Sequence, residues 1–401
     1  CYLVDNKLVV RSYDHMNWHG KRYYSFDSFL KNYFGEKIYK VSLDGGFTCP
    51  NRDGTLGTGG CIFCSEGGSG DFASSAALSV TDQITAGIEM VSRKIENGKY
   101  IAYFQAFTNT YGPIEKLEAL YMEAVNDPRI IALAIGTRPD CLPAEVLELL
   151  NQLNKIKPVF VELGLQTIHE ETASFIRRGY PLSCFDEAVM NLHKIGVLTV
   201  VHLILGLPGE TDDMMLESVR YLNHLPIHGV KFSMLHILKN TDLADHYEEH
   251  PFDVFTLESY VDLILKCIEN LSPEIVIHRL TGDGPRNLLI APEWSVYKRK
   301  VLNRIAHEMK SKGFCLRHFE EAEETCERTL KSEVWEAWKP KLNRLMLDNL
   351  DRVQEDVNWL IEKYDYRNKD ADWKESRDAV PRAMQKLAGT HPADPVFRDR
   401  R

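Results

Sequence analysis

The chain has 401 residues, of which 44% are hydrophobic and 26% charged, and its formal net charge is −10. These proportions are typical of a soluble globular enzyme with a sizeable core, built as one large domain with an appendage or as two ordinary domains. Stretches of about 18 uninterrupted apolar residues are absent from the sequence, which argues against a transmembrane helix. The first twenty residues carry charges where a signal peptide would be apolar, so we expect a cytoplasmic protein.

Six consecutive βα units are predicted from about residue 38 to residue 236. Short β-branched runs alternate there with segments of helical period, which is the pattern of a parallel sheet. Each predicted strand is apolar on both faces, as buried parallel strands are. The predicted strands are Ile38–Leu43, Tyr100–Ala106, Ile130–Ile135, Pro158–Leu163, Leu198–Leu205 and Val230–Leu235.

Capping residues predict where several helices between these strands begin and end. The predictions are Thr81 as N-cap of Asp82–Glu96, Pro113 near the start of the next helix, Ser183 as N-cap of Cys184–Ile195, Gly196 closing that helix, and a further helix after Thr211.

Beyond the sixth strand the sequence predicts a helix over Thr256–Leu271, a strand over Ile275–Leu280 and a long basic helix over Glu293–Lys312. From about residue 320 the chain becomes acidic, rich in Trp and helical in period, and its last stretch has no period. The predicted domains are an N-terminal segment (1–24), a core (25–245), a C-terminal cap (246–319), an acidic helical extension (320–388) and a flexible tail (389–401).

The unusual motifs of the core all fall late in a predicted strand or just after one. Periodicity alone does not decide between an open doubly wound sheet and a partial barrel. In both architectures ligands collect at the carboxyl ends of the strands. We therefore expect these motifs to meet at one mouth.

Three cysteines, Cys49, Cys61 and Cys64, follow the first predicted strand in a Gly-rich segment with the spacing Cys-x11-Cys-x2-Cys. Three thiolates can hold three irons of a 4Fe-4S cluster, whereas a structural zinc site or a closed electron-transfer cluster takes four ligands. A missing fourth ligand leaves one iron open for a substrate or cofactor. The alternative is a zinc site completed by a distant residue such as His278 or Cys141. A separate metal site at Cys315, His318 and Cys326 is not predicted, because these residues are scattered in a helical region.

The segment VSLDGGFTCPNRDGTLGTGGCIFC, residues 41–64, resembles the signature of one branch of the radical S-adenosylmethionine superfamily. This bacterial branch is related to the catalytic subunit of Elongator and has a wider first Cys spacing than the ordinary Cys-x3-Cys-x2-Cys loop. The resemblance spans about residues 25 to 315. It implies a partial (βα)6 barrel with a small C-terminal cap and a helical extension, and it assigns Cys49, Cys61 and Cys64 to a catalytic 4Fe-4S cluster.

Motifs at the other strand ends agree with this resemblance, which implies that they bind S-adenosylmethionine. YFQAFTNTYG lies where the superfamily binds the methionine amino group, and an Arg-Pro-Asp at 138–140 resembles that of the wider group. VELGLQT with a following arginine is similar to the ribose and carboxylate contacts, and VVHLILGLPGE to the element lining the adenine pocket. The residues so assigned are Gln105, Thr108, Asn109, Glu162, Gln166, Arg178, His202, Gly206, His236 and Leu238.

The resemblance further implies reductive cleavage of S-adenosylmethionine to a 5′-deoxyadenosyl radical, with a flavodoxin- or ferredoxin-type reductant as partner. Its branch suggests tRNA as substrate, at a wobble-uridine side chain. The net charge of −10 argues mildly against tRNA, while Arg177 with Arg178 and the basic run over residues 298–304 argue mildly for it. A radical reaction on a small metabolite and a zinc-stabilised RNA- or protein-binding module stay open as alternatives.

Overall fold

The computed structural model describes residues 2–4, 7–9, 18–68, 76–92, 98–282 and 284–312. The chain divides into two units, residues 16–315 and residues 1–15 with 316–401. The described residues of the latter form an antiparallel pair, β1 (Tyr2–Val4) and β2 (Lys7–Val9). The predicted acidic extension (320–388), the flexible tail (389–401) and the scattered ligands Cys315, His318 and Cys326 lie outside the described residues.

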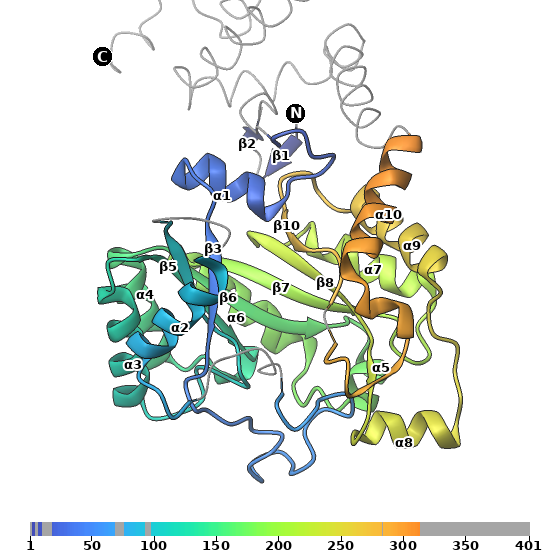
Figure 1. Cartoon of the computed structure of the whole chain (residues 1–401), viewed down its shortest axis with the longest axis horizontal. Helices are drawn as coiled ribbons and strands as arrows, with labels where there is room; N and C mark the ends of the chain where they lie inside the picture. Colours follow the sequence, from blue (N-terminus) through green and yellow to red (C-terminus); the bar gives the residue numbers. More distant parts are fainter. Residues whose placement is uncertain are drawn as a thin grey trace, which may run out of the picture. The chain divides into compact units, whose positions relative to one another are not determined.

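Residues 16–315 are built on one curled, parallel sheet of seven strands in the order β10-β8-β7-β6-β5-β4-β3 (Figure 1). Consecutive strands are neighbours throughout and the order never reverses, which distinguishes this sheet from a doubly wound one. The predicted partial barrel is therefore confirmed. The strands are β3 (Tyr39–Leu43), β4 (Tyr100–Phe104), β5 (Ile130–Thr137), β6 (Val159–Gln166), β7 (Leu198–Leu205), β8 (Gly229–Met234) and β10 (Val276–Arg279).

The seventh strand is a difference from the sequence prediction, which placed Ile275–Leu280 in a separate cap. β10 pairs with β8 in parallel, with Val276 opposite Gly229. The helix between them completes one more crossover of the βαβ type, so the sheet continues past the sixth strand.

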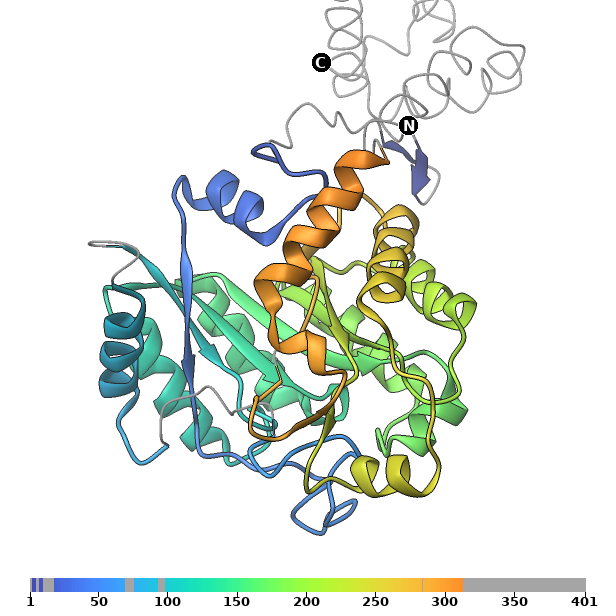
Figure 2. The same cartoon turned by 45° about the vertical axis from the view of Figure 1, so that its right-hand side comes forward.

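Helices cover the outer face of the sheet, and the main hydrophobic core lies between the two layers. The helix α10 (Lys298–Ser311) packs beside α9 (Leu257–Asn270) through Val301, Ile305 and Met309 (Figure 2). The helices that follow strands of the sheet are α2 (Val80–Ser92), α3 (Ile114–Asn126), α4 (Ala144–Ile156), α5 (Glu170–Phe175), α6 (Leu182–Lys194), α7 (Asp212–Leu222), α8 (Asp242–Glu249) and α9 (Leu257–Asn270). The remaining elements are η2 (Pro139–Cys141), β9 (Ile237–Leu238), β11 (Leu289–Ala291), η3 (Glu293–Val296) and α10 (Lys298–Ser311). Among the described residues, none of the helices has the length and apolar character needed to cross a membrane.

Two of the predicted helix caps are wrong. Thr81 lies inside α2, where the N–H of Asp82 donates to Ser79 Oγ at 3.1 Å. Ser183 lies inside α6, whose N-cap is Pro181 in an extended conformation. Thr211 does cap α7, by accepting from the N–H of Met214, and Gly196 ends α6 with a φ of 70°.

The inner face of the barrel is closed at the amino ends of the strands by α1 (Phe26–Phe34), while the loop after β3 lies at their carboxyl ends (Figure 1). Phe29 and Leu30 of α1 form a second core with Phe160 and Val200, which point inward from the strands. The Phe29 and Phe160 rings lie edge to face with centroids 6.1 Å apart. This packing closes the barrel interior at the amino ends of the strands, so the interior is open at their carboxyl ends.

Replacing Phe160 by Ala should test this closure. We expect a loss of about 3–5 kcal/mol in the free energy of unfolding, because the change leaves a cavity between α1 and the sheet. Urea denaturation followed by circular dichroism measures it. Met190→Ala, at a side chain 44% exposed on α6, is the control and should cost less than about 0.5 kcal/mol. Equal losses in the two variants would contradict the packing of α1 against Phe160.

Candidate active site

The barrel interior holds a cavity of about 540 Å³ that opens among the carboxyl ends of the strands. All three motif cysteines line it, so the structure brings the Gly-rich loop over the strand ends. Most of the predicted ligand-binding residues line the same cavity. These are Gln105, Thr108, Glu162, Gln166, Arg178, His202, His236 and Leu238.

Two predicted residues, Asn109 and Gly206, do not line the cavity. Asn109 is fully buried and its amide donates to the carbonyl of Gly136 at 2.9 Å, so it holds the turn after β4. Gly206 has a φ of 85°, and a side chain there would collide with the ring of Phe255. Both residues shape the strand ends through the backbone.

The cysteine loop is held by the side chains of Arg52 and Asn51. Arg52 donates to the carbonyl oxygens of Cys64 and Ser65, at 3.0 and 2.5 Å. The amide of Asn51 donates to the carbonyl of Arg177 at 2.7 Å, which ties the loop to the turn after α5. The loop conformation is therefore fixed by contacts of its own side chains.

The thiols receive hydrogen-bond donors from the protein. Asn51 Nδ2 lies 3.5 Å from Cys61 Sγ, and Arg138 Nη1 lies 4.0 Å from Cys49 Sγ. Donors and positive charge near the sulfur stabilise metal-bound thiolates. Burial, with the neighbouring Cys64, raises the pKa of Cys61 to about 11, so this thiol loses its proton at neutral pH only when a cation binds it. The donor set therefore fits an iron–sulfur cluster.

The two residues considered for completing a zinc site lie elsewhere. His278 stacks on Phe26 of α1, with ring centroids 4.0 Å apart, at the closed end of the barrel. Cys141 contacts Asp140 and lines a second pocket. Among the described residues, no group of three or more His, Cys, Asp or Glu side chains surrounds a single metal-ion position. The four-ligand zinc site is therefore not supported by the described part of the chain.

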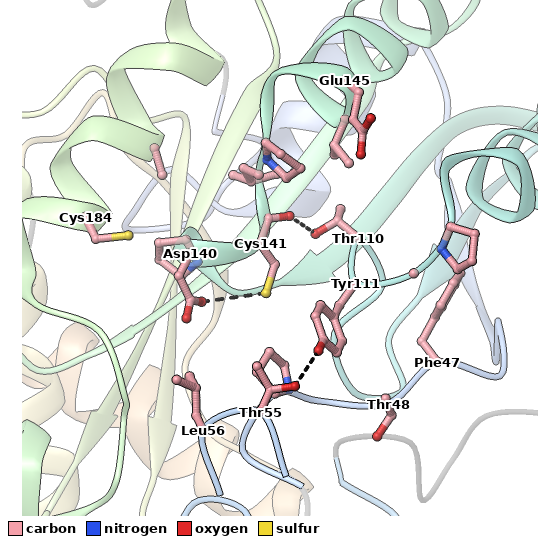
Figure 3. Close-up of a pocket in the computed structure, with 18 of the residues that line it drawn as sticks. Phe47, Thr48, Thr55, Leu56, Thr110, Tyr111, Asp140, Cys141, Glu145 and Cys184 are labelled. Carbon is pink, nitrogen blue, oxygen red and sulfur yellow. Dashed lines mark hydrogen bonds between the residues drawn. The ribbon is translucent and has the colours of Figure 1, made fainter. Parts of the chain in front are cut away.

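The second pocket has a volume of about 920 Å³ and is lined in part by Thr55 and Leu56 of the cysteine loop (Figure 3). Thr55 and Tyr111 bridge it through their hydroxyls at 2.9 Å, and Cys141 and Cys184 line its wall. None of the residues predicted to bind a ligand lines this pocket.

The centre of the cavity carries a buried ion group around Glu162 that the sequence analysis did not identify. Glu162 Oε1 accepts from Lys40 Nζ at 2.7 Å, and Oε2 accepts from Lys231 and lies 2.9 Å from His202 Nε2. Glu162 therefore binds side chains from three other strands, β3, β8 and β7. The sequence feature that could have revealed this group is a lysine inside each of two apolar strands, Lys40 in β3 and Lys231 in β8, at inward-facing positions.

Burial and charge shift the proton affinities of this group. Burial alone would raise the pKa of Glu162, but Lys231 and Lys40 outweigh it and hold that pKa well below its usual range. Burial, with the charges of Lys40 and Arg279, lowers the pKa of Lys231 to about 7 despite the attraction of Glu162. Burial and the charge of Lys231 lower the pKa of His202 to about 4, so this imidazole is neutral at pH 7.

Arg177 and Arg178 do not form the basic surface that was considered for nucleic-acid binding. Arg178 is 2% exposed and donates to the carbonyls of Thr167 and Tyr180 and to Glu170. Arg177 is paired with Asp242. Arg178, which the resemblance assigned to the cofactor, thus holds the turn that follows β6.

Gln166 occupies the end of β6 with a φ of 68°. This left-handed conformation is costly for a residue with a side chain, and such residues concentrate at functional sites. Its position on the cavity wall agrees with the sequence prediction of a ligand contact.

An open-ended partial barrel with three cysteines and polar strand ends around one cavity is the architecture of an enzyme that uses an iron–sulfur cluster together with a nucleoside cofactor. The profile of the radical SAM superfamily matches residues 52–222, and that of the Radical_SAM C-terminal domain matches residues 227–311. The chain belongs to the radical SAM superfamily, whose members use a 4Fe-4S cluster and S-adenosylmethionine. A family of unknown function, DUF6062, matches residues 303–394.

Individual relatives place the chain near the Elongator-like branch, as the sequence predicted. The uncharacterized protein YtqA of Bacillus subtilis is 43% identical over 73% of this chain and 91% of that protein. The tRNA uridine(34) acetyltransferase of Methanocaldococcus jannaschii is 26% identical over 43% of this chain and 32% of that protein. The structure of the archaeal Methanocaldococcus infernus Elp3 superposes with a TM-score of 0.54 at 18% identity, covering 69% of this chain and 63% of that one.

The pKa of Lys231 leads to a testable pH dependence of stability. The unfolded lysine keeps its proton up to about pH 10.4, whereas the folded one loses it near pH 7. The unfolded state therefore binds more protons between these values, and stability rises with pH. From pH 7 to pH 9 the wild type should gain about 2 kcal/mol relative to Lys231→Met, measured by urea denaturation. A constant difference between the two proteins would contradict the lowered pKa.

Proposed function

We propose that this chain cleaves S-adenosylmethionine reductively and uses the resulting radical to modify a uridine side chain of tRNA, at the wobble position. The observation that carries the proposal is the convergence of Cys49, Cys61 and Cys64 on the same cavity as the polar strand ends. The cluster, once bound and reduced, supplies the electron that splits the C5′–S bond into methionine and a 5′-deoxyadenosyl radical, which then takes a hydrogen atom from the substrate.

The cysteines would hold three irons and leave the fourth open for the amino and carboxylate groups of S-adenosylmethionine. Gln105 and Thr108, at the end of β4, are proposed to bind the methionine end. Gln166 at the end of β6 is proposed to bind the ribose, and His236 and Leu238 to lie beside the adenine. Asn109, Gly206 and Arg178 would support the site through the backbone, as their contacts indicate.

Glu162 and His202, which the resemblance assigned to the cofactor, are proposed to form the inner wall of the cavity. Both lie below the strand ends and bind each other. An external flavodoxin- or ferredoxin-type protein would supply the electron, since the protein itself provides orientation and exclusion of water.

The tRNA assignment is supported by the names of relatives that are tRNA uridine(34) acetyltransferases and by the helix α10. Arg299 and Lys300 are exposed on that helix, while Arg304 pairs with Glu308 at 2.8 Å. A small metabolite is the second candidate substrate. The net charge of −10 and the internal pairing of Arg177 and Arg178 favour it.

Cysteine variants test the chemistry. After anaerobic purification the wild type should contain about four irons per chain and release 5′-deoxyadenosine when given dithionite and S-adenosylmethionine. Cys61→Ala should lose this product, because one iron loses its thiolate. Cys184→Ala is the matched control, since Cys184 lines the other pocket, and it should keep both iron and product. One zinc per chain and no cleavage product in the wild type would contradict the proposal and leave a binding module.

The substrate is tested with total tRNA from cells that lack this protein. We expect this tRNA to accelerate 5′-deoxyadenosine release and to show a changed nucleoside at the wobble position by mass spectrometry. The low-molecular-weight fraction of the same cells is the control. Acceleration by that fraction and none by tRNA would replace tRNA with a small metabolite.

A further inference from the structure

The inner end of the cavity is surrounded by more basic than acidic side chains. Lys231, Arg279 and Glu162 line it, and Lys40 pairs with Glu162 from β3. Both oxygens of Glu162 are occupied, one by Lys40 and the other by Lys231 and His202.

Arg279 has no acidic partner within salt-bridge distance among the described residues. Its Nη2 donates to Ser233 Oγ, and its Nε is buried without a hydrogen-bond partner in the described part of the chain. Lys231 is 7% exposed and shares its acidic partner, Glu162, with Lys40. A buried charge without a counter-ion is costly, and proteins offset this cost with a partner. An anion between Lys231 and Arg279 would complete the group.

The depth of these residues separates them from the proposed cofactor contacts. Lys231 precedes the last residue of β8 by three positions and Glu162 precedes the last residue of β6 by four. At about 3.3 Å per residue, they lie roughly 10 Å below the strand ends. The cavity of about 540 Å³ connects the two levels. A ligand seated at the deeper level is therefore not the S-adenosylmethionine proposed for the mouth.

We propose that Lys231 and Arg279, called here the cationic floor, bind an anionic oxyacid group of the substrate, either a carboxylate or a phosphate ester. The proposal rests on the proposed radical chemistry, and it adds the chemical class of the substrate group that binds at the inner end of the cavity. The anion would accept hydrogen bonds from Lys231 Nζ and Arg279 Nε. Ser233 lines the same end of the cavity and could donate a third. Anchoring the substrate there directs the rest of it toward the cysteines at the mouth.

The test titrates anions into the holoprotein, with its cluster reconstituted, S-adenosylmethionine present and no reductant. Sodium acetate and inorganic phosphate are added separately at pH 6.5 against sodium chloride of equal ionic strength, and the melting temperature is followed anaerobically. Binding to the folded state raises the melting temperature. We expect a saturable rise in the wild type and an apparent affinity at least tenfold weaker in Lys231→Met and Arg279→Gln.

Two variants serve as controls. Lys266→Met removes an exposed lysine paired with Asp212 and should respond as the wild type does. Arg279→Lys keeps the positive charge and should retain a larger response than Arg279→Gln. A response to acetate alone identifies a carboxylate, a response to phosphate alone identifies a phosphate ester, and responses to both support the shared chemistry.

Three results would overturn the cationic floor. They are no response of the wild type to either anion, an undiminished response in both charge-removing variants, and competition between the anion and S-adenosylmethionine, which would assign the floor to the cofactor. Release of 5′-deoxyadenosine by the wild type is measured separately. Its absence contradicts the proposed function, whereas a missing anion response with cleavage intact contradicts the cationic floor alone.

Discussion

The strand order imposes the main physical constraint on this molecule. Because the seven strands follow one another without reversal, all the crossover helices lie on one face and the other face curls around an interior. That interior has to be filled by side chains from the strands and from α1. Phe29 and Phe160 fill the end nearest the strand starts, and the ion group of Glu162 follows above them. The remaining space at the strand ends is the cavity, so its position and depth both follow from the topology.

The ion group gives this interior its electrostatic character. Glu162 is fully buried between two lysines from β3 and β8, strands that the sheet separates by four others. Attraction across the barrel therefore holds opposite sides of the curled sheet together. The same burial keeps His202 neutral, which leaves Lys231 and Arg279 as the basic residues of this group that line the cavity.

Features that depend on local sequence could be predicted, whereas features that depend on neighbouring strands could not. All six predicted strands are present, because a buried parallel strand needs an apolar run and turn signals on either side. The cysteine loop could be identified because its three cysteines lie within sixteen residues, 49–64. By contrast, the partners of Glu162 lie 122 and 69 residues away. The hydrogen bond of Arg178 to the carbonyl of Thr167 could not be predicted either, because a sequence does not show where a long side chain folds back.

The closure of the barrel by α1 has a kinetic consequence. With Phe29 and Leu30 sealing one end, the cavity formed by the described residues opens among the strand ends, beside the cysteine loop. A molecule that leaves the inner end by this opening passes the cysteine loop, which Arg52 and Asn51 hold in place. Whatever occupies the mouth therefore slows exchange at the inner end.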